Sequence, residues 1–309
     1  MIIDNLRMRP FNATLMGVLR GVVDYYGIAM SDAMLFGGSG HAFVMNIHET
    51  LCPSGPYCWN RDPFYRVVRN LGIEMRDEGF FWKETPAAER MRIEALLRES
   101  LDHGVPCSLV NMEYQLITGY DDTGFLTAQP WAPKVDFPPA HLTFGSWAEM
   151  GDEVHVNFFT HPRCDAVNEH TAIAASLAYA VDLYRNPTAH SEAPYSVGAG
   201  AYAHWINAVR NGHGAEHGAW WNGTVWAECR QQASAYLAEI APRLPGQYEV
   251  ATRLSVAYAQ IAGALLQVSD RALDSMAKVA LLEQAAAIES AAIEQIEQLM
   301  VGMLSPVAA

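Results

Sequence analysis

GVPCSLVNMEYQLITGYDDTGFLTAQPW (residues 104–131) is the stretch that decides the fold class, because it alternates short apolar runs with turn residues. Together with the later run VHVNFFT (154–160), it predicts β-strands. The segment DDTG (121–124) predicts a hairpin turn, since Asp and Gly tolerate the backbone angles that such turns need. We therefore expect an antiparallel meander.

Three helices are predicted before these strands. Residues 12–27 place their apolar side chains on one helical face, with Asn12 as N-cap and Gly27 as terminator. A second helix is predicted from Asp62, the expected cap, to residue 72, and a third from 86 to 104, each with a Pro near its start. Helices followed by strands within one unit indicate an α+β domain.

The second half of the chain is predicted to be all-helical, since strand patterns disappear after about residue 165 and Ala, Glu and Gln become frequent. We therefore expect two domains, at 1–164 and 165–309. The last segment carries an apolar stripe at helical spacing, which must pack within the chain or across a homodimer. The stripe consists of Leu281, Ala285, Ile288, Ala292, Ile296, Leu299 and Met303.

Composition limits the class of protein. The chain has 309 residues, of which 50% are hydrophobic and 17% charged, a balance typical of a packed globular protein. Its net charge of −14 repels a polyphosphate backbone, so nucleic acid is not an expected partner. We expect neither a secretory signal nor a membrane span, and therefore a cytoplasmic location.

The cysteines are odd in number and spread over the chain, which argues against a disulfide framework and predicts reduced thiols. Cys52 and Cys58, the two closest in sequence, are expected to be buried or half-buried, because free cysteines are often core residues. The five are Cys52, Cys58, Cys107, Cys164 and Cys229.

Residues 10–160 resemble the papain-like fold of bacteriocin-processing peptidases and the N-terminal domain of butirosin-biosynthesis protein H, a relative of acyltransferases. The resemblance rests on the first helix, the strand-rich segment 104–131 and DYYGIAMSDAMLFGGSGHAF (24–43), which is close to the segment after the first helix in the latter group. It implies a papain-like N-terminal domain.

The catalytic positions of that family are changed here. The resemblance places a nucleophilic Cys at the start of the first helix, a His at the opening of a strand and an Asp before a Pro. The corresponding segments read NAT (12–14), EYQ (113–115) and QP (129–130). Because a papain-type reaction needs a thiolate beside an imidazole, the sequence predicts either a rebuilt site or lost catalysis.

Glu113 and Tyr114 stand where the family keeps its His. A carboxylate in a partly apolar cleft can shuttle protons, and a tyrosine hydroxyl can donate a hydrogen bond to a developing oxyanion. The alternative for Glu113 is a structural strand residue that pairs with an Arg. His41 follows the run GGSG (37–40), which is either a plain turn or a loop that offers N–H groups to a small carboxylate or carbonyl.

Two His-containing segments are candidates for metal or ligand binding. In 39–60, a strand over 42–47 would point His41 and His48 to opposite faces, which leaves His48 with Glu49 and Cys52 as the local cluster. In 211–230, His213 and His217 lie among glycines and tryptophans, a composition that predicts an aromatic-walled loop at a pocket or a plug between domains. We expect structural histidines at both places, without metal or cofactor.

These observations predict a small-molecule enzyme with a rebuilt papain-like cleft, a hydrolase or acyltransferase without a thiol nucleophile, acting on a compact polar metabolite between the domains. The alternative is a non-catalytic binding protein on the same fold. The expected catalytic residues are Glu113, Tyr114 and His41, and the expected substrate-binding residues are Asn12, Thr14, His48, Trp59, Gln129, Trp220 and Trp221.

Overall fold

The computed structural model describes residues 1–152, 154–244 and 246–304. Its contacts divide the chain into two units. The first unit comprises Met1–Met30 and Gly72–Ala166, and the second comprises Ser31–Leu71 and the residues from Val167 onward. The grouping differs from the expected division at residue 164 because residues 31–71 belong with the helical second unit.

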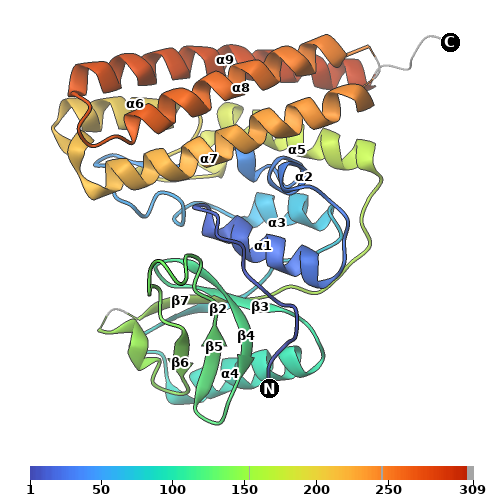
Figure 1. The fold of residues 1–309 in the computed structure, drawn as a ribbon, viewed down its shortest axis with the longest axis vertical. Helices are drawn as coiled ribbons and strands as arrows, with labels where there is room; N and C mark the ends of the chain where they lie inside the picture. Colours follow the sequence, from blue (N-terminus) through green and yellow to red (C-terminus); the bar gives the residue numbers. More distant parts are fainter. Residues whose placement is uncertain (153, 245, 305–309) are drawn as a thin grey trace. The chain divides into compact units, whose positions relative to one another are not determined.

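The first unit is built on an antiparallel sheet with the strand order β2-β7-β3-β4-β5-β6 (Figure 1). Helix α1 (Thr14–Tyr25) packs against β4, and helix α4 (Ala87–Asp102) contacts β3. The combination confirms the α+β class. The strands are β2 (Arg76–Trp82), β3 (Cys107–Val110), β4 (Tyr114–Tyr120), β5 (Gly124–Thr127), β6 (His141–Thr143) and β7 (His155–Thr160).

The predicted hairpin joins β4 to β5, with Tyr120 opposite Phe125. The Asp121 carboxylate accepts hydrogen bonds from the backbone N–H groups of Thr123, at 2.7 Å, and Gly124, at 3.0 Å. The hydrogen bonds from Thr123, together with that from Gly124, lower the pKa of Asp121 to about 2. Asp and Gly therefore close this turn as the sequence predicted.

Strand β2 corrects the expected order of helices first and strands later, because it lies between two helices. It is one of the two edge strands of the sheet and pairs with β7. Phe81 is buried, whereas its neighbours Phe80 and Trp82 are exposed. With one buried apolar position in seven residues, RDEGFFW (76–82) gives little alternation from which a strand can be predicted.

The predicted helices form, although two of the expected caps do not. Helix α1 begins after Ala13 with no side-chain cap, so Asn12 is not the N-cap. Helix α3 (Asp62–Arg69) includes Asp62 as its first residue, and Arg61 occupies the cap position. Gly27, at φ +64°, follows α1 in the left-handed conformation that glycine adopts without strain.

The second unit consists mainly of helices. Helix α7 packs along α8, and α8 packs along α9 (Figure 1). A short two-stranded sheet joins β1 (Ile47–His48) to β8 (Tyr195–Ser196). Besides α3, the helices are α2 (Asp32–Gly38), α5 (Glu169–Arg185), α6 (Ala199–Arg210), α7 (His217–Ile240), α8 (Tyr248–Val268) and α9 (Ser275–Leu304).

The apolar stripe of α9 packs within the second unit, against α5, α6 and α8. A protein-interaction scaffold would need this stripe to be exposed, so its burial argues against that function. The buried face is turned slightly from the predicted one, because Leu282 and Glu289 are fully buried where Leu281 and Ile288 were expected. The predicted positions that are buried are Ala285, Ala292, Ile296 and Leu299, and Met303 is half-buried.

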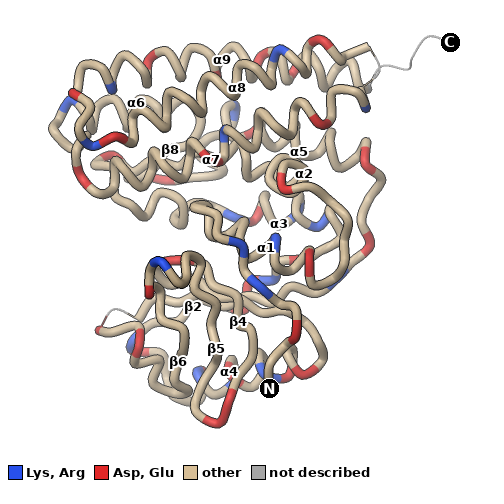
Figure 2. Tube along the Cα trace, in the orientation of Figure 1, with Lys and Arg blue, Asp and Glu red and all other residues tan. Residues whose placement is uncertain are grey.

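Charged residues of both signs are interspersed along the elements of each unit (Figure 2). Some of them join helices of the second unit at the surface. Arg185 of α5 contacts Glu297 of α9 at 2.7 Å, and Arg210 of α6 contacts Glu283 of α9 at 2.8 Å. Exposed pairs of this kind contribute at most about 1 kcal/mol each, so they fix the register of α9 less than its buried face does. Among the described residues, no helix is long and apolar enough to cross a membrane.

Candidate functional site

Thr14 and Glu113 form a buried pair in the first unit. The Thr14 hydroxyl, Oγ1, donates a 2.8 Å hydrogen bond to Glu113 Oε2. The same oxygen accepts a 3.2 Å hydrogen bond from the backbone N–H of Tyr114. Thr14 is 1% exposed and Glu113 7% exposed. The structure thus joins two residues that are 99 positions apart in the sequence. Thr14 lies in the segment where the resemblance places a nucleophile, and Glu113 lies where it places the base.

Secondary structure explains why these two side chains meet. Thr14 is the first residue of α1, and Glu113 directly precedes β4, against which α1 packs. The N-terminus of a helix carries a partial positive charge, which favours a nearby carboxylate and would also favour a developing oxyanion. A carboxylate that accepts the proton of a hydroxyl is the arrangement that activates an oxygen nucleophile.

Tyr114 directly follows Glu113, and Gln129 lies in the loop between β5 and β6. The Tyr114 ring is fully buried and packs against Phe159, with ring centroids 6.1 Å apart. Gln129 uses both amide N–H groups within its own loop, donating to Asp136 Oδ1 and to the Pro138 carbonyl, each at 2.8 Å. In the structure Gln129 therefore stabilises the loop before β6.

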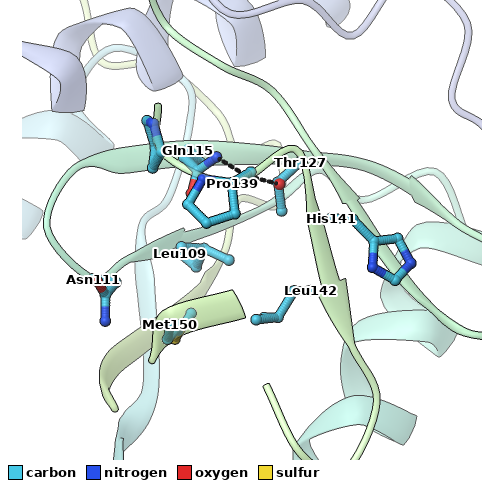
Figure 3. Close-up of a pocket in the computed structure, with 9 residues that line it drawn as sticks. Leu109, Asn111, Gln115, Thr127, Pro139, His141, Leu142 and Met150 are labelled. Atoms are coloured by element: carbon cyan, nitrogen blue, oxygen red, sulfur yellow. Dashed lines mark hydrogen bonds between the residues drawn. The ribbon is translucent and has the colours of Figure 1, made fainter. Parts of the chain in front are cut away.

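A small pocket lies in the same unit, beside the strands β3, β4 and β5 (Figure 3). Its cavity volume is about 10 Å³, which is room for about one water molecule. Gln115 reaches it from β4 and donates 3.0 and 2.8 Å hydrogen bonds to the carbonyls of Ala128 and Pro139. The Thr127 hydroxyl donates to the same Pro139 carbonyl at 2.6 Å, so one wall of the pocket is held by two polar side chains.

His141 and Asn111 add polar groups to the lining of this pocket. His141 Nδ1 lies 3.4 Å from Glu149 Oε1, and Asn111 donates to the His155 carbonyl at 3.0 Å. His141, Asn111 and Gln115 were not predicted as site residues from the sequence. The alternation of side chains along a strand could have indicated Gln115, because Gln115 lies two residues after Glu113 and therefore on the same face of the strand.

His41 lies in the second unit and is buried. Residues His41–Phe43 form a 3-10 turn and only Ile47–His48 is a strand, so His41 and His48 do not lie on the two faces of one strand over 42–47. His41 Nδ1 is 3.6 Å from Cys229 Sγ. Burial, with a smaller effect of the Arg230 charge, lowers the pKa of His41 to about 3. The imidazole is therefore neutral at physiological pH.

The GGSG run before His41 is not a free loop. Gly37 and Gly38 are the last residues of α2, and a Cβ atom on Gly37 would lie 1.9 Å from Cγ of Tyr236. Close helix packing therefore requires glycine at this position. Gly40, at φ +80°, makes the turn into the 3-10 segment.

The aromatic residues expected around a substrate also belong to the second unit. Trp59 is buried, and its ring centroid lies 6.1 Å from that of His41. Trp221 is buried and donates a 3.2 Å hydrogen bond to the Tyr57 hydroxyl, whereas Trp220 is 38% exposed. All three tryptophans therefore belong to the second unit, whereas Thr14 and Glu113 belong to the first. His48 is half-buried and packs edge-on against Tyr195, and Asn12 is half-buried in the first unit.

The described residues contain no group of three or more His, Cys, Asp or Glu side chains arranged to hold a metal ion. His213 pairs with Glu216 at 3.1 Å, and the His217 ring packs against Trp220. Helix α7 begins at His217, so most of the loop expected over 211–230 is helical. Cys58 is exposed, contrary to expectation, and Cys52 is half-buried.

Comparison with known proteins gives one partial similarity. No family model matches the chain. A xylose isomerase from Thermus caldophilus is 28% identical over 113 residues. The match covers 31% of this chain and 29% of that protein. With under a third of either chain covered, the similarity indicates neither a family nor an activity for the whole protein.

Proposed function

We propose that this chain is a small-molecule enzyme of the hydrolase or acyltransferase type, with its reaction centre at Thr14 and Glu113 on a papain-like first unit. The observation that carries the proposal is the 2.8 Å hydrogen bond from the Thr14 hydroxyl to the Glu113 carboxylate. It reproduces the pairing of nucleophile and base with an oxygen in place of the sulfur and a carboxylate in place of the imidazole.

The chemistry follows from this pairing. Glu113 accepts the hydroxyl proton while Thr14 Oγ1 attacks the acyl carbon of a thioester or amide. An ester bond to Thr14 forms, the bond to the leaving thiolate or amine breaks, and Glu113 returns the proton to the leaving group. Water or an acceptor amine then takes the acyl group and regenerates the hydroxyl. The N-terminus of α1 supplies positive potential for the oxyanion of each step.

Polar side chains line a small cavity near the proposed reaction centre. Gln115 lines it and lies two residues from Glu113, which corresponds to about 7 Å along a strand. A cavity of about 10 Å³ holds about one water molecule, so a substrate enters only if the surrounding chain moves, as the burial of Thr14 and Glu113 also requires. We expect a short acyl group with a polar carrier, consistent with Asn111 and His141 in the lining.

Short-chain acyl thioesters and amides test the proposal, with released thiol or amine as the measure of turnover and intact-protein mass as the measure of acylation. Thr14→Val should abolish the acyl adduct, and Glu113→Gln should lower kcat by about 100-fold or more, the usual contribution of a general base. Thr118→Val is the matched control, because Thr118 loses a comparable hydrogen bond, to the Leu126 carbonyl, elsewhere on β4. Turnover that persists in both Thr14→Val and Glu113→Gln contradicts the proposal.

A non-catalytic binding protein is the second candidate, favoured by the burial of the pair. At 1% and 7% exposure, Thr14 and Glu113 give a substrate little access unless the surrounding chain moves. The binding hypothesis predicts a ligand that raises the Tm without being consumed. A thermal shift that vanishes in Glu113→Gln, with no adduct or released product in the wild type, supports binding over catalysis.

A further inference from the structure

A segment without regular secondary structure precedes α1 and runs back along that helix. The backbone N–H of Arg9 donates a 3.2 Å hydrogen bond to the Gly17 carbonyl. A Cβ atom on Gly17 would lie 2.4 Å from the Arg9 carbonyl oxygen, and a Cβ atom on Gly21 would lie 2.4 Å from the Arg7 carbonyl oxygen. We call residues 7–11 the strap. Because two glycines one helical turn apart leave room for its backbone, the strap lies directly on α1.

The strap follows the face of α1 that carries Thr14. Side chains three and seven positions apart share one face of an α-helix, so Thr14, Gly17 and Gly21 form a row. The helix advances about 6 Å from Gly17 to Gly21, a distance that two residues of the strap span, and it advances about 4.5 Å from Thr14 to Gly17. The next two residues of the strap, Pro10 and Phe11, cover that second distance. They therefore lie at the level of Thr14.

A surface ion pair holds the strap beside the helix. Arg9 Nε lies 3.2 Å from Asp24 Oδ2, and the two side chains are 58% and 36% exposed. Asp24 also contacts Arg20 at 2.6 Å, so its carboxylate keeps a cation when Arg9 leaves. Arg9 and Pro10 are exposed, whereas residues 14–23 of α1 are buried beneath. An exposed segment outside the helices and strands belongs to the part of a fold that opens most easily.

We propose that the strap is the lid of the Thr14–Glu113 site and opens to admit the substrate. The inference rests on the proposed function, since it gives a route to a pair that is 1% and 7% exposed. Helix α1 and the start of β4 hold the pair together and cannot separate without breaking its hydrogen bond, whereas the strap contains neither residue. Asn5, at φ +67°, and Ala13, the residue before α1, flank the strap at positions of the kind that serve as hinges.

Thiol labelling of Thr14→Cys measures the opening of the strap without any need for turnover. Adding Gly17→Ala should raise the labelling rate by about 10-fold or more, because the new Cβ atom overpacks against the strap. Adding Arg9→Ala should raise it by about 2–5-fold, the effect expected from the loss of one exposed ion pair. Arg76→Ala is the matched control, since Arg76 is 59% exposed, pairs with Glu74 at 2.6 Å in the same unit and should leave the rate unchanged.

Cys107 reports on unfolding of the same unit, because its side chain is fully buried. Faster labelling at position 14 in either variant, with unchanged labelling of Cys107, supports the lid. Unchanged labelling at position 14 in both Gly17→Ala and Arg9→Ala overturns it. Equal acceleration at Cys107 also overturns it, because the strap would then open only when the whole unit unfolds.

Acylation of the protein with Thr14 intact separates this inference from the proposed function. Faster labelling at position 14, without any acyl adduct from the thioesters, retains the lid and removes the catalytic function. Turnover that depends on Thr14, with unchanged labelling at position 14 in both variants, removes the lid alone.

Discussion

The structure predicts that this protein loses stability in mild acid because of two buried histidines, one in each unit. Burial lowers the pKa of His161 in the first unit to about 4, and burial with a contribution from Arg230 lowers that of His41 in the second to about 3. Nε2 of His161 lies 2.7 Å from the Ser108 hydroxyl in the interior of its unit. Both imidazoles are therefore neutral in the native state down to acid pH.

The sign and size of the effect follow from linkage between protonation and unfolding. The unfolded chain binds a proton on each histidine below about pH 6.5, whereas the native state does not until the pH approaches 4 for His161 or 3 for His41. Stability is thus complete above pH 6.5 and falls as the pH drops through the window between the two values. From pH 7.5 to pH 5.0 each histidine removes about 2 kcal/mol from the free energy of unfolding.

Urea denaturation at a series of pH values measures this loss. His161→Gln and His41→Gln should each reduce the slope of the unfolding free energy against pH by about one proton between pH 5 and 6, whatever their stability at pH 7.5. Exposed His170 on α5 gives the control, since His170→Gln is expected to keep the wild-type slope. The reasoning is refuted if both buried-histidine variants retain that slope.

Two further predictions concern packing and thiol reactivity. Gly37→Ala should lower the free energy of unfolding, measured in urea, by about 1–3 kcal/mol, because its Cβ atom would lie 1.9 Å from the Tyr236 ring. Gly263→Ala, on the exposed face of α8, has open space around its Cβ atom and should raise the free energy of unfolding by about 0.5–1 kcal/mol. In native-state labelling with a thiol reagent, exposed Cys58 should react first, while Cys229 should react only on unfolding because burial raises its pKa; labelling of both at equal rates would contradict this.

The parts of the fold that could be predicted from the sequence are those with a strong local pattern. The strands after Gly104 and the 121–124 hairpin are confirmed, because alternation and turn residues act within a few positions. Edge strand β2 was missed, since an edge strand with one face exposed needs few apolar residues. The conformation of residues 42–47 could not be predicted, because fully buried apolar residues in a short segment do not distinguish a strand from an irregular chain.

Some residues of the candidate site were selected from the sequence and others were missed. The missed residues interact with partners that are distant in the sequence. Thr14 and Glu113 were selected from positions in a family pattern, Thr14 for substrate binding and Glu113 for catalysis, and the structure joins them by a hydrogen bond. It does not test their role. Gln115 was missed because its two hydrogen bonds go to backbone carbonyls of residues that only the folded sheet brings near. His41 was expected beside Glu113, but it is buried in the second unit. No local sequence pattern indicates to which unit a residue belongs.

Glu289 shows most clearly what a periodic pattern leaves out. Glu289 is fully buried on α9, whereas Ile288, the residue before it, is only half-buried. The apolar spacing predicted Ile288 for the buried face, because a glutamate does not continue an apolar stripe. Burying a carboxylate is tolerable only if a cation and further donors reach it, and Arg230 and Tyr202 come from two other helices to do so. Removing either Arg230 or Glu289 alone would leave the other charge buried without its ionic partner. An unexplained acidic residue inside an apolar stripe is therefore better treated as a signal for a distant cation than as an error in the pattern.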